Sequence, residues 1–336
     1  MAKLHAGRQS LIFPDSPILS CWASAAGKKE AQGPLGRTYD VTSINPYWGE
    51  KTWEQAEQKM QVLTLEALFR KARISSDQVD LIFSGDLLNQ CVASSFALRN
   101  AEIPHLGLYG ACSTMAEGLV LASMAVSGGF ADKAVAMTSS HFAASERQYR
   151  FPLGYGCQRT PTSQWTVTGA GAVLVTPEGK GPSVIAASVG TVADLGVTDA
   201  GNMGAAMAPA AYETLRAHFD DLKTGPEDYT HIVTGDLGQI GRELLLELAL
   251  RDGIHLEDKL LDCGCMVYDN TTQHVHAGGS GCGCSAIVLC GELLPRLGPG
   301  ESLLFCGTGA LLSPVTTQQK LPIPAICHAV AIRGRN

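Results

Sequence analysis

Along the chain, segments whose apolar residues recur at helical spacing alternate with short apolar runs typical of strands. In residues 52–72, "TWEQAEQKMQVLTLEALFRKA", apolar side chains recur at helical spacing, which predicts a helix. Thr52, with Gln55 three residues later, is typical of a helix N-cap. The segment "DLIFSGDLLNQ" from Asp80 then predicts an apolar strand that ends in Gly-Asp and leads into a helical stretch. Helix and strand therefore alternate through the first half.

The second half repeats this order. "HIVTGDLGQIG" from His231 has the same succession as "DLIFSGDLLNQ": an apolar strand, a small hydroxyl residue, Gly, Asp and Leu. The segment "APAAYETLRAHFDDLK" predicts the matching helix before it. Asp86 and Asp236 of the two segments lie close to half the chain apart. The repetition predicts a duplicated unit.

Later segments fit the same plan. Further strands are predicted in "KAVAMTSS" and "WTVTGAGAVLVTP" of the first half and in "SLLFCGTGALLSPV" of the second. Strands that alternate with helices predict largely parallel sheets covered by helices on both faces. We predict an α/β fold with two duplicated halves, residues 1–178 and 179–336, whose parallel-rich mixed sheets are covered by helices. Residues 139–163 break the pattern, because they are rich in arginine, aromatic residues, glycine and proline without a steady period, and they predict a long irregular excursion.

Composition narrows the class of protein. The 336 residues are 45% hydrophobic and 17% charged, as in a compact α/β protein. The formal net charge of −7 argues against a nucleic-acid-binding surface. No apolar stretch approaches the ~20 residues of a membrane-spanning helix, and "MAKLHAGRQSLIFPDS" lacks the features of a secretory signal. We therefore expect a protein of a cytosolic compartment.

Eleven cysteines are spread along the chain, and this odd count favours reduced, buried thiols over a disulfide framework. The segment "DCGCMVYDNTTQHVHAGGSGCGCS" contains enough cysteine and histidine for a zinc site. Both cysteine pairs are Cys-Gly-Cys, however, whereas structural zinc sites usually have two to four residues between ligands. We expect small buried residues here, with no metal and no cofactor.

A candidate nucleophile lies in "LYGACSTMAEGL", where Cys112 stands between a short apolar run and the start of a helix. This residue is a working nucleophile, the remnant of one, or a small buried residue. A helix N-terminus lowers the pKa of a thiol, so we expect Cys112 to be partly ionised. Covalent chemistry also needs a base for the thiol proton and donors for the oxyanion, which other parts of the chain must supply.

Several motifs together resemble a known fold. The duplicated halves, the cysteine after "GLYGA", the strand "TGAGAVLV" and the closing "LLFCGTGALLS" resemble the thiolase fold, and within it ketoacyl synthase III. The segments "GPLGRTYD", "WGEKTWEQAE" and "SERQYRFPLGYGCQRTPTSQWTVTGAGA" resemble the stage V sporulation protein AD family of spore-forming Firmicutes. The resemblance covers nearly the whole chain.

The chain departs from ketoacyl synthase III at two positions. Those enzymes pair the cysteine with a histidine and an asparagine of the second half. This sequence has Gly235 and Asp236 where the histidine is expected, and Gly279 where the asparagine is expected. The resemblance therefore implies a non-catalytic binding protein. An acyltransferase that uses Cys112 with a histidine from elsewhere, such as His231 or His276, and a structural partner without any small-molecule ligand are the alternatives.

The closer family resemblance implies a ligand and a setting. The ligand is dipicolinic acid (pyridine-2,6-dicarboxylate), free or as a calcium complex, taken up into the developing spore. The implied partners are the other stage V sporulation A membrane proteins, and the fold implies a homodimer. The implied place is the forespore or spore, with association to the inner spore membrane through these partners.

A dicarboxylate needs backbone donors and cations, which a helix N-terminus and arginines can supply. The residues that we predict to bind the ligand are Cys112, Ser113, His141, Arg147, Arg150, Arg159, Asp236, His276, Ser280 and Thr308. Each has a structural alternative: the arginines as solvated loop charges, His141 as a satisfied strand-end residue, and Asp236 as a turn residue like Asp86. Trp165 and Tyr155 are candidates for stacking on the pyridine ring, although core packing is the more common use of such residues.

Overall fold

The computed structural model describes residues 4–149 and 159–335, and its main sheet consists of two similar runs of strands. The first run is, in spatial order, β3 (Ile18–Ala26), β9 (Gly169–Thr176), β7 (Ala134–Ser140), β5 (Leu81–Gly85) and β6 (His105–Leu108). The second run is β10 (Ser183–Val189), β15 (Ala325–Arg333), β14 (Ser302–Ala310), β11 (His231–Thr234) and β12 (Leu260–Asp262).

The two runs share their strand directions as well as their order. In each run the first strand pairs antiparallel with the second, and the second antiparallel with the third. The third, fourth and fifth strands of each run are mutually parallel. The runs meet where β3 and β10 pair at Ile18 and Ser183. The predicted α/β fold of two duplicated halves with mixed sheets is thus confirmed, while the boundary at 178/179, which falls between β9 and β10, stays a prediction.

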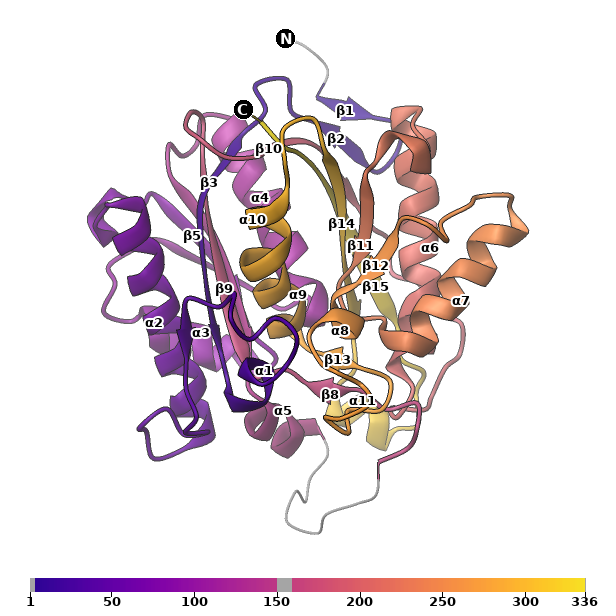
Figure 1. Cartoon of the computed structure of the whole chain (residues 1–336), viewed down its shortest axis with the longest axis horizontal. Coiled ribbons are helices and arrows are strands. Elements are labelled where there is room, and N and C mark those ends of the chain that lie inside the picture. Colours follow the sequence, from indigo (N-terminus) through magenta and orange to yellow (C-terminus); the bar gives the residue numbers. More distant parts are fainter. Residues whose placement is uncertain (1–3, 150–158, 336) are drawn as a thin grey trace.

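Helices cover both faces of each run and complete five layers (Figure 1). The outer helices are α2 (Trp53–Ala72) and α3 (Val92–Leu98) on the first half, and α6 (Met203–Leu222) and α7 (Gly238–Arg251) on the second. The central helices are α4 (Thr114–Ser127) and α9 (Cys282–Val288). Apolar side chains from both central helices and both runs form one core, which contains Met115, Ile287 and Phe305. A helix covered on both faces must be apolar all round, which explains the composition of α4 and α9.

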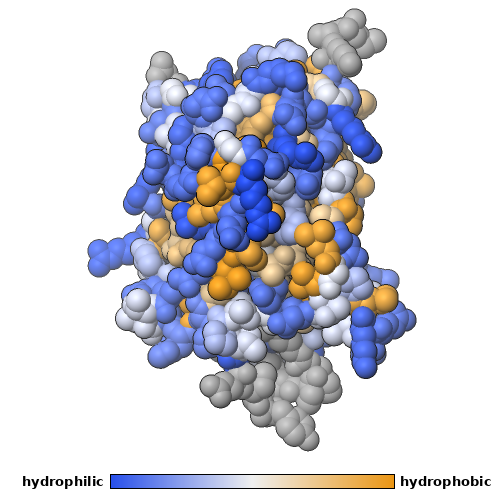
Figure 2. All heavy atoms as spheres, turned by 90° about the vertical axis from the view of Figure 1, so that its right-hand side faces the viewer, coloured by the Kyte–Doolittle hydropathy of each residue, from blue (hydrophilic) through white to orange (hydrophobic). Residues whose placement is uncertain are grey.

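The remaining elements are short. The strands are β1 (His5–Ala6), β2 (Ser10–Ile12), β4 (Val41–Thr42), β8 (Trp165–Thr166) and β13 (Gly279–Ser280). The helices are α1 (Lys28–Ala31), α5 (Phe142–Tyr149), α8 (Cys263–Met266), α10 (Leu294–Arg296) and α11 (Pro314–Gln318). In the described part of the chain, no helix is both long and apolar enough to span a membrane. Figure 2 shows that the α6/α7 side of the molecule carries separate groups of hydrophobic residues among hydrophilic ones.

The predicted start of the helix is correct for α2 in the first half and too late for α6 in the second. Thr52 caps α2, since its side chain accepts a hydrogen bond from the Gln55 N–H at 3.2 Å. The helix predicted to begin at residue 208 instead begins at Met203, where the side chain of Asn202 accepts from the Ala205 N–H. The missed signal was an asparagine cap six residues before the predicted segment.

The irregular excursion predicted for residues 139–163 is partly wrong. Its first two residues are the end of β7, and Phe142–Tyr149 form α5. Residues 150–158 lie outside the described part. The strand predicted from Trp165 is also divided, because β8 leaves the main sheet and pairs in parallel with β13 of the second half. This small second sheet joins the two halves beside Cys112.

Candidate functional site

Cys112 lies in a sharp turn between β6 and α4. The turn is a 3₁₀ segment, Ala111–Ser113, in which Ala111 has a φ of 52°. This left-handed conformation is strained for an alanine, so the surrounding structure must hold it in place. Cys112 is 6% exposed and packs with Leu87, Tyr149 and Cys282.

A small cavity of about 60 Å³ adjoins the Cys112 side chain. Both halves of the chain contribute to its wall. The lining residues are Leu87, Ala111, Cys112, Ser145, Glu146, Tyr149 and Thr166 of the first half, and Met203, Ser280, Ala310 and Leu312 of the second. The structure therefore places Cys112 and Ser280 at one cavity, and their contact with a ligand stays a prediction.

Asp236 connects this cavity to the second half. Its Oδ2 accepts hydrogen bonds from the Ser280 hydroxyl at 3.0 Å and the Gly281 N–H at 2.9 Å. Its Oδ1 accepts from the Thr308 hydroxyl at 2.9 Å, and the carboxylate also interacts with the Cys112 thiol. Full burial raises the pKa of Asp236 to about 6, against the lowering effect of these donors. The structure thus brings together four of the predicted residues.

The predicted ionisation of Cys112 is wrong. Burial raises the pKa of its thiol well above the ordinary value of 9.0, and the negative charge of Asp236 raises it further. Desolvation disfavours the thiolate more strongly than a helix N-terminus favours it at this position. The thiol is therefore protonated at neutral pH.

Two glycines allow the close packing around this site. Gly281 has a φ of 99°, and a Cβ there would lie 2.7 Å from the Ser140 hydroxyl. Gly283, the middle residue of the second Cys-Gly-Cys pair, approaches the Gly169 carbonyl so closely that a Cβ would lie 2.5 Å from its oxygen. Close packing of α9 on β9 therefore explains the glycine between these two cysteines.

In the described residues, no group of three or more His, Cys, Asp or Glu side chains is arranged to hold a metal.

The predicted histidines lie elsewhere. His141 is buried, and its Nε2 contacts the Pro46 carbonyl at 2.8 Å on the wall of a different cavity. His276 and His231 are exposed. Neither histidine nor asparagine is among the described residues that line the Cys112 cavity. The structure thus places neither His141 nor His276 at this cavity, and their contact with a ligand stays a prediction.

Ser113 and the arginines differ in their distance from the cavity. The Ser113 hydroxyl donates to the Gly110 carbonyl at 2.7 Å, so it serves the turn and does not line the cavity. Arg147 is also outside the lining, paired with Glu54. Arg159 does not line the cavity either, but its Nη1 lies 3.7 Å from Oε1 of Glu146, which does. The predictions for Arg150 and Tyr155 fall outside the described residues.

Sequence reasoning missed three residues that shape the site. Glu146 and Tyr149 belong to α5, whose existence the composition of the excursion concealed. Gln164 donates from Nε2 to the carbonyls of Asp236 at 2.7 Å and Gly279 at 2.8 Å, which fixes the second-half loops against β8. The only available signal was the position of Gln164 just before the predicted strand.

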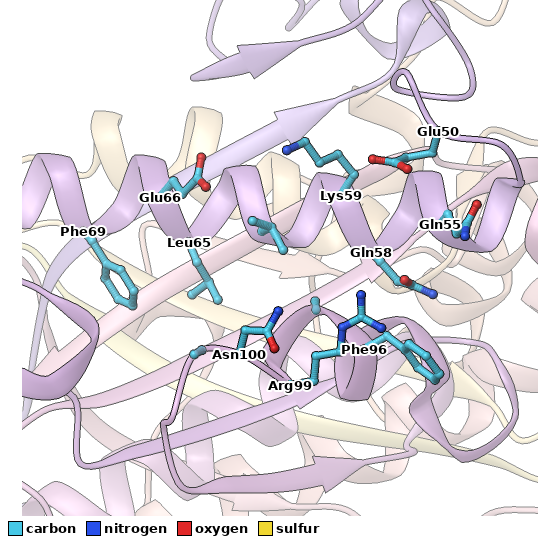
Figure 3. Close-up of a pocket in the computed structure, with 13 residues that line it drawn as sticks. Glu50, Gln55, Gln58, Lys59, Leu65, Glu66, Phe69, Phe96, Arg99 and Asn100 are labelled. Carbon is cyan, nitrogen blue, oxygen red and sulfur yellow. The ribbon is translucent and has the colours of Figure 1, made fainter.

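A larger hollow lies away from Cys112, between α2 and α3 (Figure 3). Its volume is about 360 Å³. Lys59 and Glu66 of α2 and Arg99 after α3 line it, so its wall carries charges of both signs. It contains no cysteine, serine or histidine that could act as a nucleophile or base.

Comparison with known proteins identifies the family. The family model described as "Stage V sporulation protein AD" matches residues 7–333. The chain belongs to the stage V sporulation protein AD family. It is 42% identical over 326 residues to the stage V sporulation protein AD of Bacillus subtilis (strain 168), with 96% of each chain covered. This family membership makes it a sporulation protein.

Solved structures show what the stage V sporulation protein AD family shares with condensing enzymes. 3-Oxoacyl-[acyl-carrier-protein] synthase III from Aquifex aeolicus VF5 superposes with a TM-score of 0.58 at 15% identity, covering 95% of this chain and 99% of its own. Xanthomonas campestris OleA bound with cerulenin gives 0.59 at 16% identity, covering 96% and 97%. At such identities the likeness concerns the fold alone, and it confirms the thiolase-type architecture.

Proposed function

We propose that this protein is a non-catalytic receptor for dipicolinic acid that takes part in its uptake into the developing spore. Membership of a sporulation family supports the setting. The observation that carries the non-catalytic part is the contact between Asp236 and a protonated Cys112 thiol. Asp236 stands where the resemblance to ketoacyl synthase III implies a histidine.

The energetics of the Asp236–Cys112 pair disfavour acyl transfer. The pKa of Asp236 is about 6, whereas that of the thiol lies well above 9.0. Proton transfer from sulfur to the carboxylate is therefore strongly unfavourable. Each oxyanion donor that a condensing site lacks costs a further ~2.7–4 kcal/mol. Together these terms would make covalent turnover at Cys112 very slow.

Calorimetric titration of the full chain with dipicolinate tests the receptor function. We expect saturable binding, both with and without calcium. Cys112→Ala should change the affinity only modestly, because the protonated thiol offers a weak donor and little contact area. A flat titration of the wild-type protein would contradict the proposal.

The alternative function is a ketoacyl synthase III-like acyltransferase. The fold of the condensing enzymes and the position of Cys112 at a helix N-terminus favour this candidate. Incubation with an acyl-CoA followed by intact-mass analysis separates the two functions. Acylation of Cys112 would support the transferase, and an unchanged mass would support the receptor.

We further propose that the protein is a homodimer that joins other stage V sporulation A membrane proteins at the inner membrane of the forespore. The strand β6 is an edge of the main sheet, and Leu106 on it is 53% exposed. Such an edge favours pairing with a second copy. Light scattering should give a dimer for the wild type and a monomer for Leu106→Asp, which places like charges near the symmetry axis. Cell fractionation with and without the membrane partners tests the location.

A further inference from the structure

The Cys112 cavity is small for the ligand of the proposed function. Its volume is about 60 Å³, whereas cavities that bind small molecules usually measure about 300–1,000 Å³. A six-membered ring with two carboxylates cannot enter it while the walls stay in place. Binding at this cavity therefore requires that part of its wall moves.

Much of the wall is tied into the central helices or the sheets. Cys112 lies in the turn at the start of α4, and Ala310 ends β14 of the main sheet. Thr166 and Ser280 belong to the paired strands β8 and β13. Helix α5 lies outside the sheets (Figure 1) and supplies the lining residues Ser145, Glu146 and Tyr149. It is the part of the wall whose displacement disturbs the fold least.

The start of α5 is held in place. The Phe142 N–H donates to the Thr168 hydroxyl at 3.1 Å, and the Phe142 ring stacks on the Trp165 ring with centroids 4.0 Å apart. The preceding residue, His141, contacts the Pro46 carbonyl through Nε2 at 2.8 Å. A movement of α5 is therefore a rotation about its first turn, which displaces its last turn most.

Side chains hold the last turn of α5 against the turn that follows β5. The Gln148 Nε2 donates to the Leu87 carbonyl at 2.9 Å, and the Gln148 Oε1 accepts from the Asn89 N–H at 2.9 Å. The Tyr149 hydroxyl donates to the same Leu87 carbonyl at 2.6 Å. We call these three hydrogen bonds the α5 latch. Leu87 and Tyr149 both line the Cys112 cavity, so the latch closes its wall.

The turn that receives the latch is itself firmly held. Gln90 and Cys91 have left-handed φ values of 56° and 51°, which are uncommon for residues other than glycine. The Asp86 carboxylate accepts from the Leu88 N–H at 2.9 Å, and the Cys91 thiol donates to the Leu108 carbonyl at 2.9 Å. Strained backbone of this kind persists where its surroundings hold it, and it gathers at ligand clamps and switches. The turn is thus the fixed side of the latch, and α5 is the moving side.

We propose that the α5 latch controls access to the Cys112 cavity: rotation of the last turn of α5 breaks the latch, moves Tyr149 out of the wall and admits the ligand. For the identity of the ligand this inference rests on the proposed function. The closed state competes with binding, because the closed wall leaves no room for the ligand. A weaker latch should therefore raise the affinity, since the apparent dissociation constant falls as the fraction of open molecules rises.

Gln148→Ala weakens the latch without removing a ligand contact, because Gln148 is not among the described residues that line the cavity. It removes two of the three hydrogen bonds and should raise the open fraction about tenfold. Tyr149→Phe removes the third bond and should act in the same direction. Gln78→Ala is the matched control, since the Gln78 Oε1 accepts from the Ser75 N–H at 3.0 Å in an exposed turn between α2 and β5.

Alkylation of Cys112 by N-ethylmaleimide at fixed pH measures opening without any dipicolinate. Cys112 is 6% exposed, so the reagent reacts from the open state and the rate follows the open fraction. Peptide mapping should show about tenfold faster modification in Gln148→Ala, faster modification in Tyr149→Phe and the wild-type rate in Gln78→Ala. Calorimetric titration with dipicolinate should show about tenfold tighter binding by Gln148→Ala and wild-type affinity for Gln78→Ala.

The two measurements separate the latch from the proposed function. Faster alkylation and tighter dipicolinate binding in Gln148→Ala support both. An unchanged alkylation rate, or an affinity of Gln148→Ala no higher than that of a wild type that binds dipicolinate, overturns the latch but keeps the receptor function. Faster alkylation of Gln148→Ala, with no dipicolinate binding by any of the proteins, keeps the latch and overturns the receptor function.

Discussion

The Gly-Asp turns of the two halves have the same sequence pattern but different roles. In the first half, the Asp86 carboxylate accepts from the Leu88 N–H at 2.9 Å and from the N–H and hydroxyl of Ser94 at 2.8 and 2.7 Å. It therefore stabilises the start of the helix that follows it. In the second half, Asp236 faces Ser280, Gly281, Thr308 and the Cys112 thiol instead.

The neighbouring strand explains the difference. Thr234 of β11 pairs with Asp262 of β12, and the Asp262 carboxylate accepts from the N–H groups of Leu237 at 2.8 Å and Gly238 at 3.0 Å at the start of α7. The corresponding pair of the first half is Ser84 with Gly107, which has no side chain to supply. Asp86 therefore accepts the N–H groups at the start of its own helix, whereas in the second half Asp262, and not Asp236, accepts them. Asp236 is thus available for the contacts around Cys112.

The largest effect is expected for Asp262→Ala. This change leaves the buried N–H groups of Leu237 and Gly238 without their acceptor, and the free energy of unfolding should fall by about 3–5 kcal/mol. Denaturant titration measures the loss. Asp269→Ala removes an acceptor for the Thr271 N–H in a partly exposed turn, where water replaces it, and should cost far less than Asp262→Ala. If both variants lost the same free energy of unfolding, the account of Asp262 as the acceptor for buried N–H groups of α7 would be wrong.

Next in size is the pH dependence caused by Asp236. Burial raises its pKa from 3.8 to about 6, so the folded state binds this proton more tightly than the unfolded state. Its contribution to the free energy of unfolding is therefore fully present below pH 3.8 and is lost as pH rises through about 6, by about 3 kcal/mol in all. The stability difference between Asp236→Asn and wild type should shift by most of this amount, in favour of the variant, between pH 4 and pH 7. A difference that stays constant with pH would show that Asp236 is ionised throughout.

A smaller loss is expected for Asp86→Ala. The Leu88 and Ser94 N–H groups lose their acceptor, but the buried carboxyl of Glu57 loses a repulsive neighbour, since Asp86 helps to raise the pKa of Glu57. We expect a decrease of about 2 kcal/mol, less than for Asp262→Ala. The same denaturant titration checks it. A larger loss than that of Asp262→Ala would reverse the comparison between the halves.

The sequence predicted the fold well because its signals are periodic and occur twice. The resemblance to the thiolase fold is what nominated Cys112, Asp236, Ser280 and Thr308, and the structure brings these four residues together. His141 and Arg147 were misplaced because α5 was read as irregular chain: the helix directs Glu146 and Tyr149 to the cavity and Arg147 to Glu54. The pKa of Cys112 depends on burial and on a partner from the other half, neither of which a linear pattern contains.

The central claim is that burial, reinforced by the negative charge of Asp236, keeps the Cys112 thiol protonated. The pH dependence of Cys112 alkylation by iodoacetamide, followed by peptide mapping in wild type and Asp236→Asn, tests it most directly. Wild-type Cys112 should stay almost unreactive up to about pH 9, and Asp236→Asn should react at least about tenfold faster at pH 8, because the like charge is gone. A wild-type thiol that already reacts fully near pH 7, at a rate that Asp236→Asn leaves unchanged, would contradict the account.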